Sequence, residues 1–141
     1  MKFKFRFASV LKVRRYQEKE EKQKLGALLK KKKGLERDFL NLKELCQSDI
    51  EESKNLTMHE NRRHYAQKHT WHKQLARLSR LINQLNNKLA EQRNKLAEAY
   101  KKTRMMEKLK DNEKKSFIQY VERVEQHQQN EIAIQRYNTN Y

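Results

Sequence analysis

The feature that most limits the fold of this chain is the absence of proline from all 141 residues, together with the presence of only two glycines, Gly26 and Gly34. Proline and glycine are the residues that most disfavour the interior of an α-helix. A chain that lacks the first and almost lacks the second can form helices of unusual length. The sequence therefore predicts an all-α fold.

Apolar residues recur at alternating spacings of three and four along two stretches of the sequence. This heptad pattern is typical of a coiled coil, because it places one apolar stripe on a helix. Lys32 interrupts the first stretch, and six polar residues interrupt the second. The first stretch consists of Leu25, Leu28, Leu35, Phe39, Leu42 and Cys46, and the second of Leu75, Leu78, Ile82, Leu85, Leu89, Leu96, Ala99, Met106, Phe117, Tyr120, Val124 and Ile134.

Residues 53–60, which separate the two patterns, have no apolar period. Thr57 and Glu60 have the spacing of a capping box, in which two side chains satisfy free backbone donors at the start of a helix. We therefore predict an antiparallel coiled-coil hairpin, with a single continuous helix that dimerises as the alternative. The predicted single domain is residues 1–141, with one helix from about Phe5 to Ser53, a turn at about 53–57 and a second helix from about Met58 to Tyr137.

Charge near the predicted turn also favours a hairpin. Asp49, Glu51 and Glu52 lie at the end of the first helix, where the helix dipole disfavours acidic side chains. A chain that reverses near residue 56 places these acids beside Arg62 and Arg63 of the second helix. We therefore expect opposite charges to meet across the two helices at this end.

The two predicted helices differ in length. If the chain reverses near residue 56, Phe5 lies beside about residue 107, and the second helix extends alone for roughly 30 residues, or about 45 Å. The apolar stripe continues along this overhang through Phe117, Tyr120, Val124 and Ile134. Because an exposed apolar stripe on a helix is a surface for a partner, we expect the overhang to dock on another protein.

The formal net charge of +16 favours anionic partners, whether nucleic acid, membrane surface or acidic protein. Two glycines eight residues apart cannot form a phosphate-binding loop, and no catalytic set of residues stands out. His69 and His72 share a helix face, but zinc prefers four ligands, and the single cysteine, Cys46, lies on the other helix. We therefore expect no enzyme activity, no metal, no cofactor and no small-molecule substrate.

Three segments, taken in order, resemble the FliJ family of bacterial flagellar export components. Residues 5–14 (FRFASVLKVR) are similar to the opening motif of that family, and residues 63–65 are similar to its tyrosine-bearing segment after the turn. Residues 106–110 and 125–133 resemble its C-terminal pattern. The sequence departs from the family pattern at Lys68, where an aromatic residue is usual.

The resemblance implies a cytoplasmic stalk, similar to the gamma subunit of rotary ATPases, at the cytoplasmic side of the inner membrane at the flagellar base. Its implied partners are the hexameric export ATPase, the cytoplasmic domain of the membrane export gate, and export chaperones. By position, the candidate gate-binding residues are Tyr65, Lys68, Trp71, His72 and Leu75. The candidate ATPase-binding residues are Phe5, Phe7, Leu11, Phe117, Tyr120 and Val124.

Two other functions are compatible with these patterns. One is the equivalent stalk of a virulence-type secretion system. The other is a nucleic-acid-binding coiled coil, which the charge allows but for which the sequence has no helix-turn-helix or zinc-finger spacing. Nucleic acid is therefore not our expected partner. For Trp71, packing against the first helix is as consistent with the sequence as a partner site.

Overall fold

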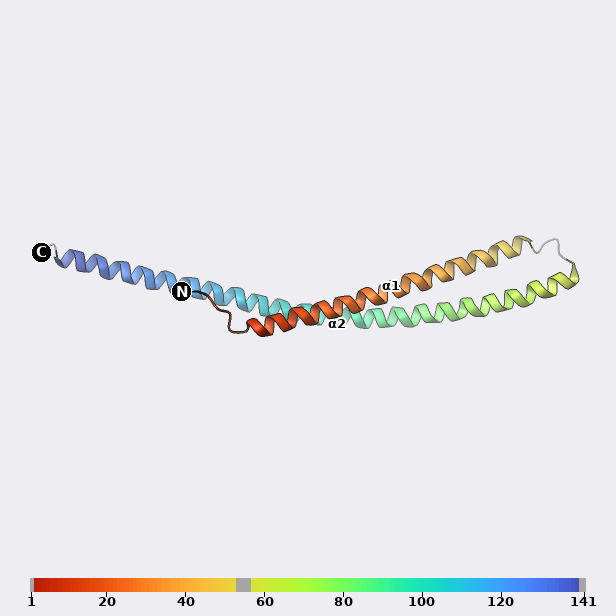
Figure 1. The fold of residues 1–141 in the computed structure, drawn as a ribbon, viewed down its shortest axis with the longest axis horizontal. Helices are drawn as coiled ribbons and strands as arrows, with labels where there is room; N and C mark the ends of the chain where they lie inside the picture. Colours follow the sequence, from red (N-terminus) through yellow and green to blue (C-terminus); the bar gives the residue numbers. More distant parts are fainter. Residues whose placement is uncertain (1, 53–56, 140–141) are drawn as a thin grey trace. The chain divides into compact units, whose positions relative to one another are not determined.

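The computed structural model describes residues 2–52 and 57–139, and for residues 50–52 and 59 it describes the backbone only. Over these residues the chain contains two α-helices and no strand. Helix α1 spans Ala8–Glu52 and helix α2 spans Met58–Thr139 (Figure 1). The two helices pack against each other in opposite directions, which confirms the predicted all-α coiled-coil hairpin.

The chain forms two compact units, and each contains part of both helices. Unit 1 consists of Met1–Glu18 and Glu98–Tyr141, and unit 2 consists of Lys19–Ala97. The predicted turn falls largely on residues 53–56, which lie outside the described residues, as does the predicted last residue of the first helix, Ser53.

The start of α2 shows part of the predicted capping box. The Thr57 backbone N–H donates a hydrogen bond to Glu60 Oε2 at 3.3 Å. The Asn61 N–H donates to the Thr57 carbonyl at 2.9 Å, which is the first hydrogen bond of the helix. Thr57 is therefore the residue that caps α2, as its spacing from Glu60 predicts.

In unit 2, the buried and half-buried positions follow the heptad pattern on both helices. On α1 they recur at spacings of three and four from Glu21 to Asp49, with Leu29 as an additional half-buried position, and on α2 they do so from His64 to Leu96. Every apolar residue that the pattern assigned to this seam is among them, and Lys32 also lies at an inward position. The most buried apolar residues of unit 2 are Cys46, Leu85 and Leu89.

A polar contact crosses the apolar seam of unit 2. Gln92, which is only 7% exposed, donates a hydrogen bond from its side-chain amide to the Glu21 carbonyl at 3.1 Å and another to the Glu21 carboxylate. A polar residue at a seam position fits only when its partner stands opposite. This contact therefore favours one register of α1 against α2 over registers displaced by a helical turn.

Asp49 makes a different contact from the one that the charge pattern predicts. Its Oδ1 lies 2.6 Å from His64 Nδ1, and Asp49 is only 6% exposed, whereas Arg62 and Arg63 are exposed. The expected pairing of Asp49 with the arginines is wrong because Asp49 and His64 both occupy inward heptad positions and the arginines do not. The side chains of Glu51 and Glu52 lie outside the described residues.

The N-terminal segment of unit 1 is not helical up to Phe7, and α1 begins at Ala8 rather than at about Phe5. In this segment Phe3, Phe5 and Phe7 are buried or half-buried, whereas the basic residues that alternate with them are exposed. Alternation with a period of two is the pattern of an extended chain with one apolar face. The sequence KFKFRF at residues 2–7 therefore packs its phenylalanines inward without forming a helix.

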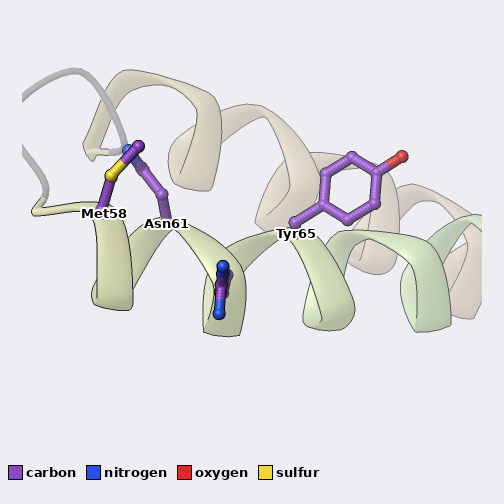
Figure 2. A pocket seen from close by; sticks show the side chains of 4 residues that line it. Met58, Asn61 and Tyr65 are labelled. Atoms are coloured by element: carbon purple, nitrogen blue, oxygen red, sulfur yellow. The ribbon is translucent and has the colours of Figure 1, made fainter.

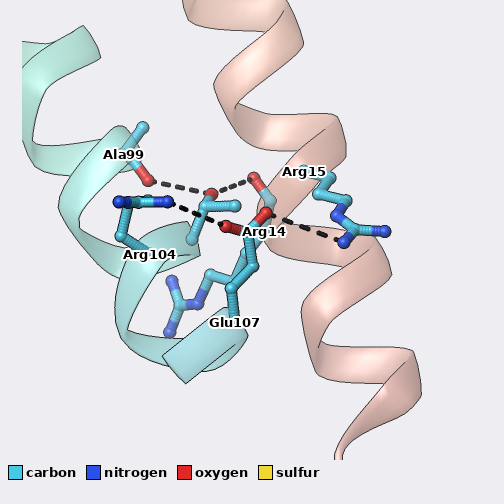
Figure 3. Close-up of polar contacts among 6 residues, drawn as sticks. Arg14, Arg15, Ala99, Arg104 and Glu107 are labelled. Atoms are coloured by element: carbon cyan, nitrogen blue, oxygen red, sulfur yellow. Dashed lines mark hydrogen bonds and ion pairs between the residues drawn. The ribbon is translucent and has the colours of Figure 1, made fainter. Parts of the chain in front are cut away.

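Polar contacts join the first turns of α1 to α2 in unit 1, and an aromatic contact joins the non-helical N-terminal segment to α2. The single hydroxyl proton of Thr103 is shared between the Arg14 carbonyl, 3.3 Å from Oγ1, and the Ala99 carbonyl, 3.1 Å from Oγ1 (Figure 3). Arg15 forms an ion pair with Glu107 at 3.6 Å. Further along, the rings of Phe3 and Phe117 lie 5.6 Å apart. The eleven-residue distance in sequence from Arg14 back to Phe3 is thus matched by a fourteen-residue distance along α2, from Thr103 to Phe117.

This difference corrects the predicted length of the overhang. A non-helical chain advances up to about 3.3 Å per residue, compared with 1.5 Å for a helix, so residues 2–7 cover more of α2 than a helix would. Half-buried side chains continue on α2 as far as Val124, and every described residue from 125 to 139 is exposed. The uncovered end of α2 is therefore about half as long as predicted.

We expect the substitution Gln92→Ala to lower the free energy of unfolding by about 0.5–1.5 kcal/mol, because it removes the hydrogen bonds from Gln92 to Glu21 and leaves the Glu21 carboxylate with its ion pair to Lys24. The matched control is Gln84→Ala, which makes the same change at an exposed position of α2 and should have almost no effect. Urea unfolding followed by circular dichroism measures both. Equal effects of the two substitutions would show that the Gln92 contact does not stabilise the seam.

We expect Gly34→Ala to raise the free energy of unfolding by about 0.5–1 kcal/mol, because alanine is the better helix former. A Cβ atom at Gly34 would meet no heavy atom within 4 Å, so the substitution has no steric cost. Thermal unfolding followed by circular dichroism should show a higher Tm. Gly26→Ala should have a similar effect for the same reason, and a lower Tm for either variant would contradict this argument.

Candidate partner-binding surfaces

The structure does not bring the five candidate gate-binding residues onto one surface. Lys68, Trp71 and Leu75 are half-buried at heptad positions that face α1, whereas Tyr65 and His72 are exposed, Tyr65 at 77%. Trp71 therefore belongs to the seam, as one of the two interpretations of its sequence position predicts. Only Tyr65 and His72 of this set are exposed.

Tyr65 lies beside an open hollow at the start of α2, where Met58 is 89% exposed. Figure 2 shows Met58, Asn61 and Tyr65 on this stretch of α2, and Arg62 completes the lining of the hollow. Met58 was not among the predicted site residues. Its apolar side chain stands outside the heptad pattern, so that pattern does not select it.

A second hollow in unit 2 lies between α1 and α2, and sequence reasoning also missed it. Leu45 and Leu81, which line it, are 55% and 37% exposed. Both occupy positions that flank the seam, where a leucine is partly uncovered in a two-helix coiled coil. The residues that line this hollow are Asp38, Asn41, Leu42, Leu45, Gln74, Arg77, Leu78 and Leu81.

Most of the six candidate ATPase-binding residues form the apolar interior of unit 1. Phe5 and Leu11 are buried, at 9% and 3% exposure, and Phe7, Phe117 and Val124 are half-buried. Tyr120 is 58% exposed. The heptad frame assigned Tyr120 to the stripe, but the inward position is occupied by Val121, because the spacing after Phe117 is four rather than three.

The uncovered end of α2, residues 125–139, carries three large exposed residues that are apolar or aromatic. Ile132, Ile134 and Tyr137 are 51%, 60% and 64% exposed. Ile134 was assigned to the stripe from the sequence, whereas Ile132 and Tyr137 were not. In Figure 1 this part of α2 extends past the N-terminal end of the chain.

The histidines near the start of α2 do not gather into a metal site in the part of the chain that the structure describes. His69 and His72 are exposed, and His64 is engaged by Asp49. Among the described residues, no three His, Cys, Asp or Glu side chains lie close enough together to hold a metal ion. No described helix is long and apolar enough to cross a membrane.

Two long antiparallel helices whose exposed apolar side chains lie at their ends and beside their seam are typical of coiled-coil proteins that act by binding partners. The family model described as "Flagellar FliJ protein" matches residues 3–141. The chain therefore belongs to the FliJ family, as the resemblance of its motifs indicates, and has a role related to flagellar export. Comparisons with curated proteins and with solved structures find no match.

We expect Phe5→Ala to release the N-terminal segment of unit 1 from α2, because the ring of Phe5 is buried there and its removal leaves a cavity. Limited trypsin digestion, followed by mass spectrometry, should then show faster cleavage after Lys4 and Arg6. The matched control is Val13→Ala, whose side chain is 54% exposed and should leave the cleavage rate unchanged. Unchanged cleavage in Phe5→Ala would show that the segment is not held by this ring.

Proposed function

We propose that this protein is a non-catalytic stalk and adaptor of flagellar export. In this proposal it binds the export ATPase, promotes assembly of the ATPase ring, contacts the cytoplasmic domain of the membrane export gate and escorts export chaperones. The family match supports the flagellar system over the equivalent stalk of a virulence-type system.

The observation that carries the proposal is the uncovered end of α2. From residue 125 to 139 every described side chain is exposed, although Ile132, Ile134 and Tyr137 are apolar or aromatic. Apolar side chains exposed to water on a lone helix are unfavourable, and burying them against a partner surface would lower the free energy. A helix end that α1 does not cover can also enter a ring of subunits.

The ATPase contact in this proposal uses residues 118–139 rather than the six residues first assigned to it. Of those six, Tyr120 is mostly exposed and remains a contact candidate. The buried residues Phe5 and Leu11 would support the contact by holding the N-terminal segment on α2, and so by fixing where the uncovered end begins.

For the gate contact, we propose the exposed residues near the start of α2 in unit 2. Tyr65 and His72 retain this role, and Met58 joins them because its thioether is almost fully exposed beside Tyr65. Methionine adapts its shape to irregular apolar surfaces. We propose a cytoplasmic location at the inner membrane at the flagellar base, which follows from this gate contact.

Deleting residues 125–139 should abolish stimulation of the purified export ATPase and leave the free protein helical. ATP hydrolysis and the mass of the ATPase assembly, measured by light scattering, test the contact, and circular dichroism tests the fold. The control is Tyr65→Ala with Met58→Ala, which should weaken binding to the purified gate domain but not change ATP hydrolysis. Full stimulation by the shortened chain would contradict the assignment of the ATPase contact to this end.

A further inference from the structure

A third hollow in unit 2 has lysines from both helices on its edges and leucines at its base. It has a volume of about 220 Å³. Leu85 is 4% exposed and Leu81 is 37% exposed, so the leucines form a floor that is partly open to solvent. The residues that line the hollow are Lys31 and Leu35 of α1 and Leu81, Gln84, Leu85 and Lys88 of α2.

The two charged residues that line this hollow, Lys31 and Lys88, are both positive, and the acidic residues nearest to them in the sequence are Glu36 and Glu91. Helix α1 has no acidic residue from Lys22 to Leu35, and α2 has none from Asn61 to Ala90. In coiled coils, the positions beside the seam usually pair opposite charges, and like charges across it are destabilising. The ion pairs in this part of α1 join Lys24 to Glu21 and Lys32 to Glu36, and they do not include Lys31.

The size and the chemistry of the hollow limit what can occupy it. Pockets for small organic ligands are typically about 300–1,000 Å³, so this hollow is too small for such a ligand. The leucines at its base have no hydrogen-bond donor for a phosphate group, whereas Lys31 and Lys88 favour an anion. An apolar side chain flanked by carboxylates satisfies both requirements, and an amphipathic helix presents these groups along one face.

We propose that this hollow is the docking site for an acidic amphipathic helix of another protein. A leucine-like side chain of that helix enters between Leu35, Leu81 and Leu85, and acidic residues on either side of it pair with Lys31 and Lys88. The three helices then form a local three-helix bundle. This inference does not rest on the proposed function, since neither the ATPase contact nor the gate contact uses these residues.

The test uses the full-length protein and a fluorescein-labelled synthetic helix with leucines at heptad positions a and d and glutamates beside them. Fluorescence anisotropy should show binding, whereas the same helix with lysines in place of the glutamates should not bind. The double variant Lys31→Glu with Lys88→Glu should bind about tenfold more weakly, because two attractive charge pairs become repulsive. Leu81→Gln should also weaken binding, because it removes part of the floor without changing the charge.

The matched control is Lys101→Glu with Lys102→Glu, which makes the same change in net charge at exposed positions of unit 1. It should retain most of the binding, and equal weakening by the two double variants would overturn the proposal in favour of a general charge effect. Vesicles of anionic phospholipid and a DNA duplex are further probes. Binding of either probe that depends on Lys31 and Lys88, without binding of the acidic helix, would also overturn it.

A second measurement separates docking from a structural role. The single substitution Lys31→Glu removes one of the two like charges that line the hollow and should not lower the Tm of the free protein while it weakens binding of the acidic helix. If Lys31 served only the fold, its substitution would change the Tm and the affinity for the acidic helix in the same direction. A lower Tm together with unchanged binding would overturn the proposal.

Discussion

The seam between α1 and α2 is the interaction on which the described structure depends. Each helix is long and polar, and in water most of its stability comes from burying one apolar stripe against a neighbour. In unit 2 this stripe holds Leu85 and Leu89 almost fully buried, and in unit 1 it does the same for Leu11. The exposed surfaces of the protein differ in their position relative to this seam: some lie opposite it, some lie beside it, and one lies beyond the point where it ends.

An apolar seam alone does not specify how far one helix is displaced along the other, because leucine packs equally well against several leucines. Polar groups within the seam supply that information. Gln92 meets Glu21, and His64 meets Asp49, in unit 2, and Thr103 meets the Arg14 carbonyl in unit 1. A displaced register would leave Gln92 and Asp49 buried without their partners on the facing helix, whereas Thr103 would keep its bond to the Ala99 carbonyl. The same register places Lys31 and Lys88 on one hollow and leaves the last part of α2 uncovered.

The heptad spacing was sufficient to predict both helices and the inward residues of unit 2, because the period of a coiled coil is a property of the sequence alone. Their antiparallel packing was predicted from the break between the two heptad frames and the capping-box spacing of Thr57 and Glu60. The heptad spacing could not predict which residues beside the seam stay exposed. The exposure of a residue beside the seam depends on the side chains of the facing helix. For this reason the pattern did not predict Leu45, Leu81 and the lysine-edged hollow. The pattern also failed at residues 2–7, where the phenylalanines alternate with a period of two and the chain is not helical. That alternation was visible in the sequence and would have predicted the segment correctly.

The non-helical N-terminal segment has a consequence for the end of α2. A helical segment of the same length would stop short of Phe117 and leave the apolar residues Phe117, Val121 and Val124 in water. The extended segment reaches Phe117 with Phe3 and keeps all three half-buried. Cover thus ends where the stripe becomes mostly polar, and the apolar side chains beyond it are few and separated. An end of this kind stays free of non-specific association, since large apolar patches are what drive it, and still offers Ile132, Ile134 and Tyr137 to a surface with matching recesses.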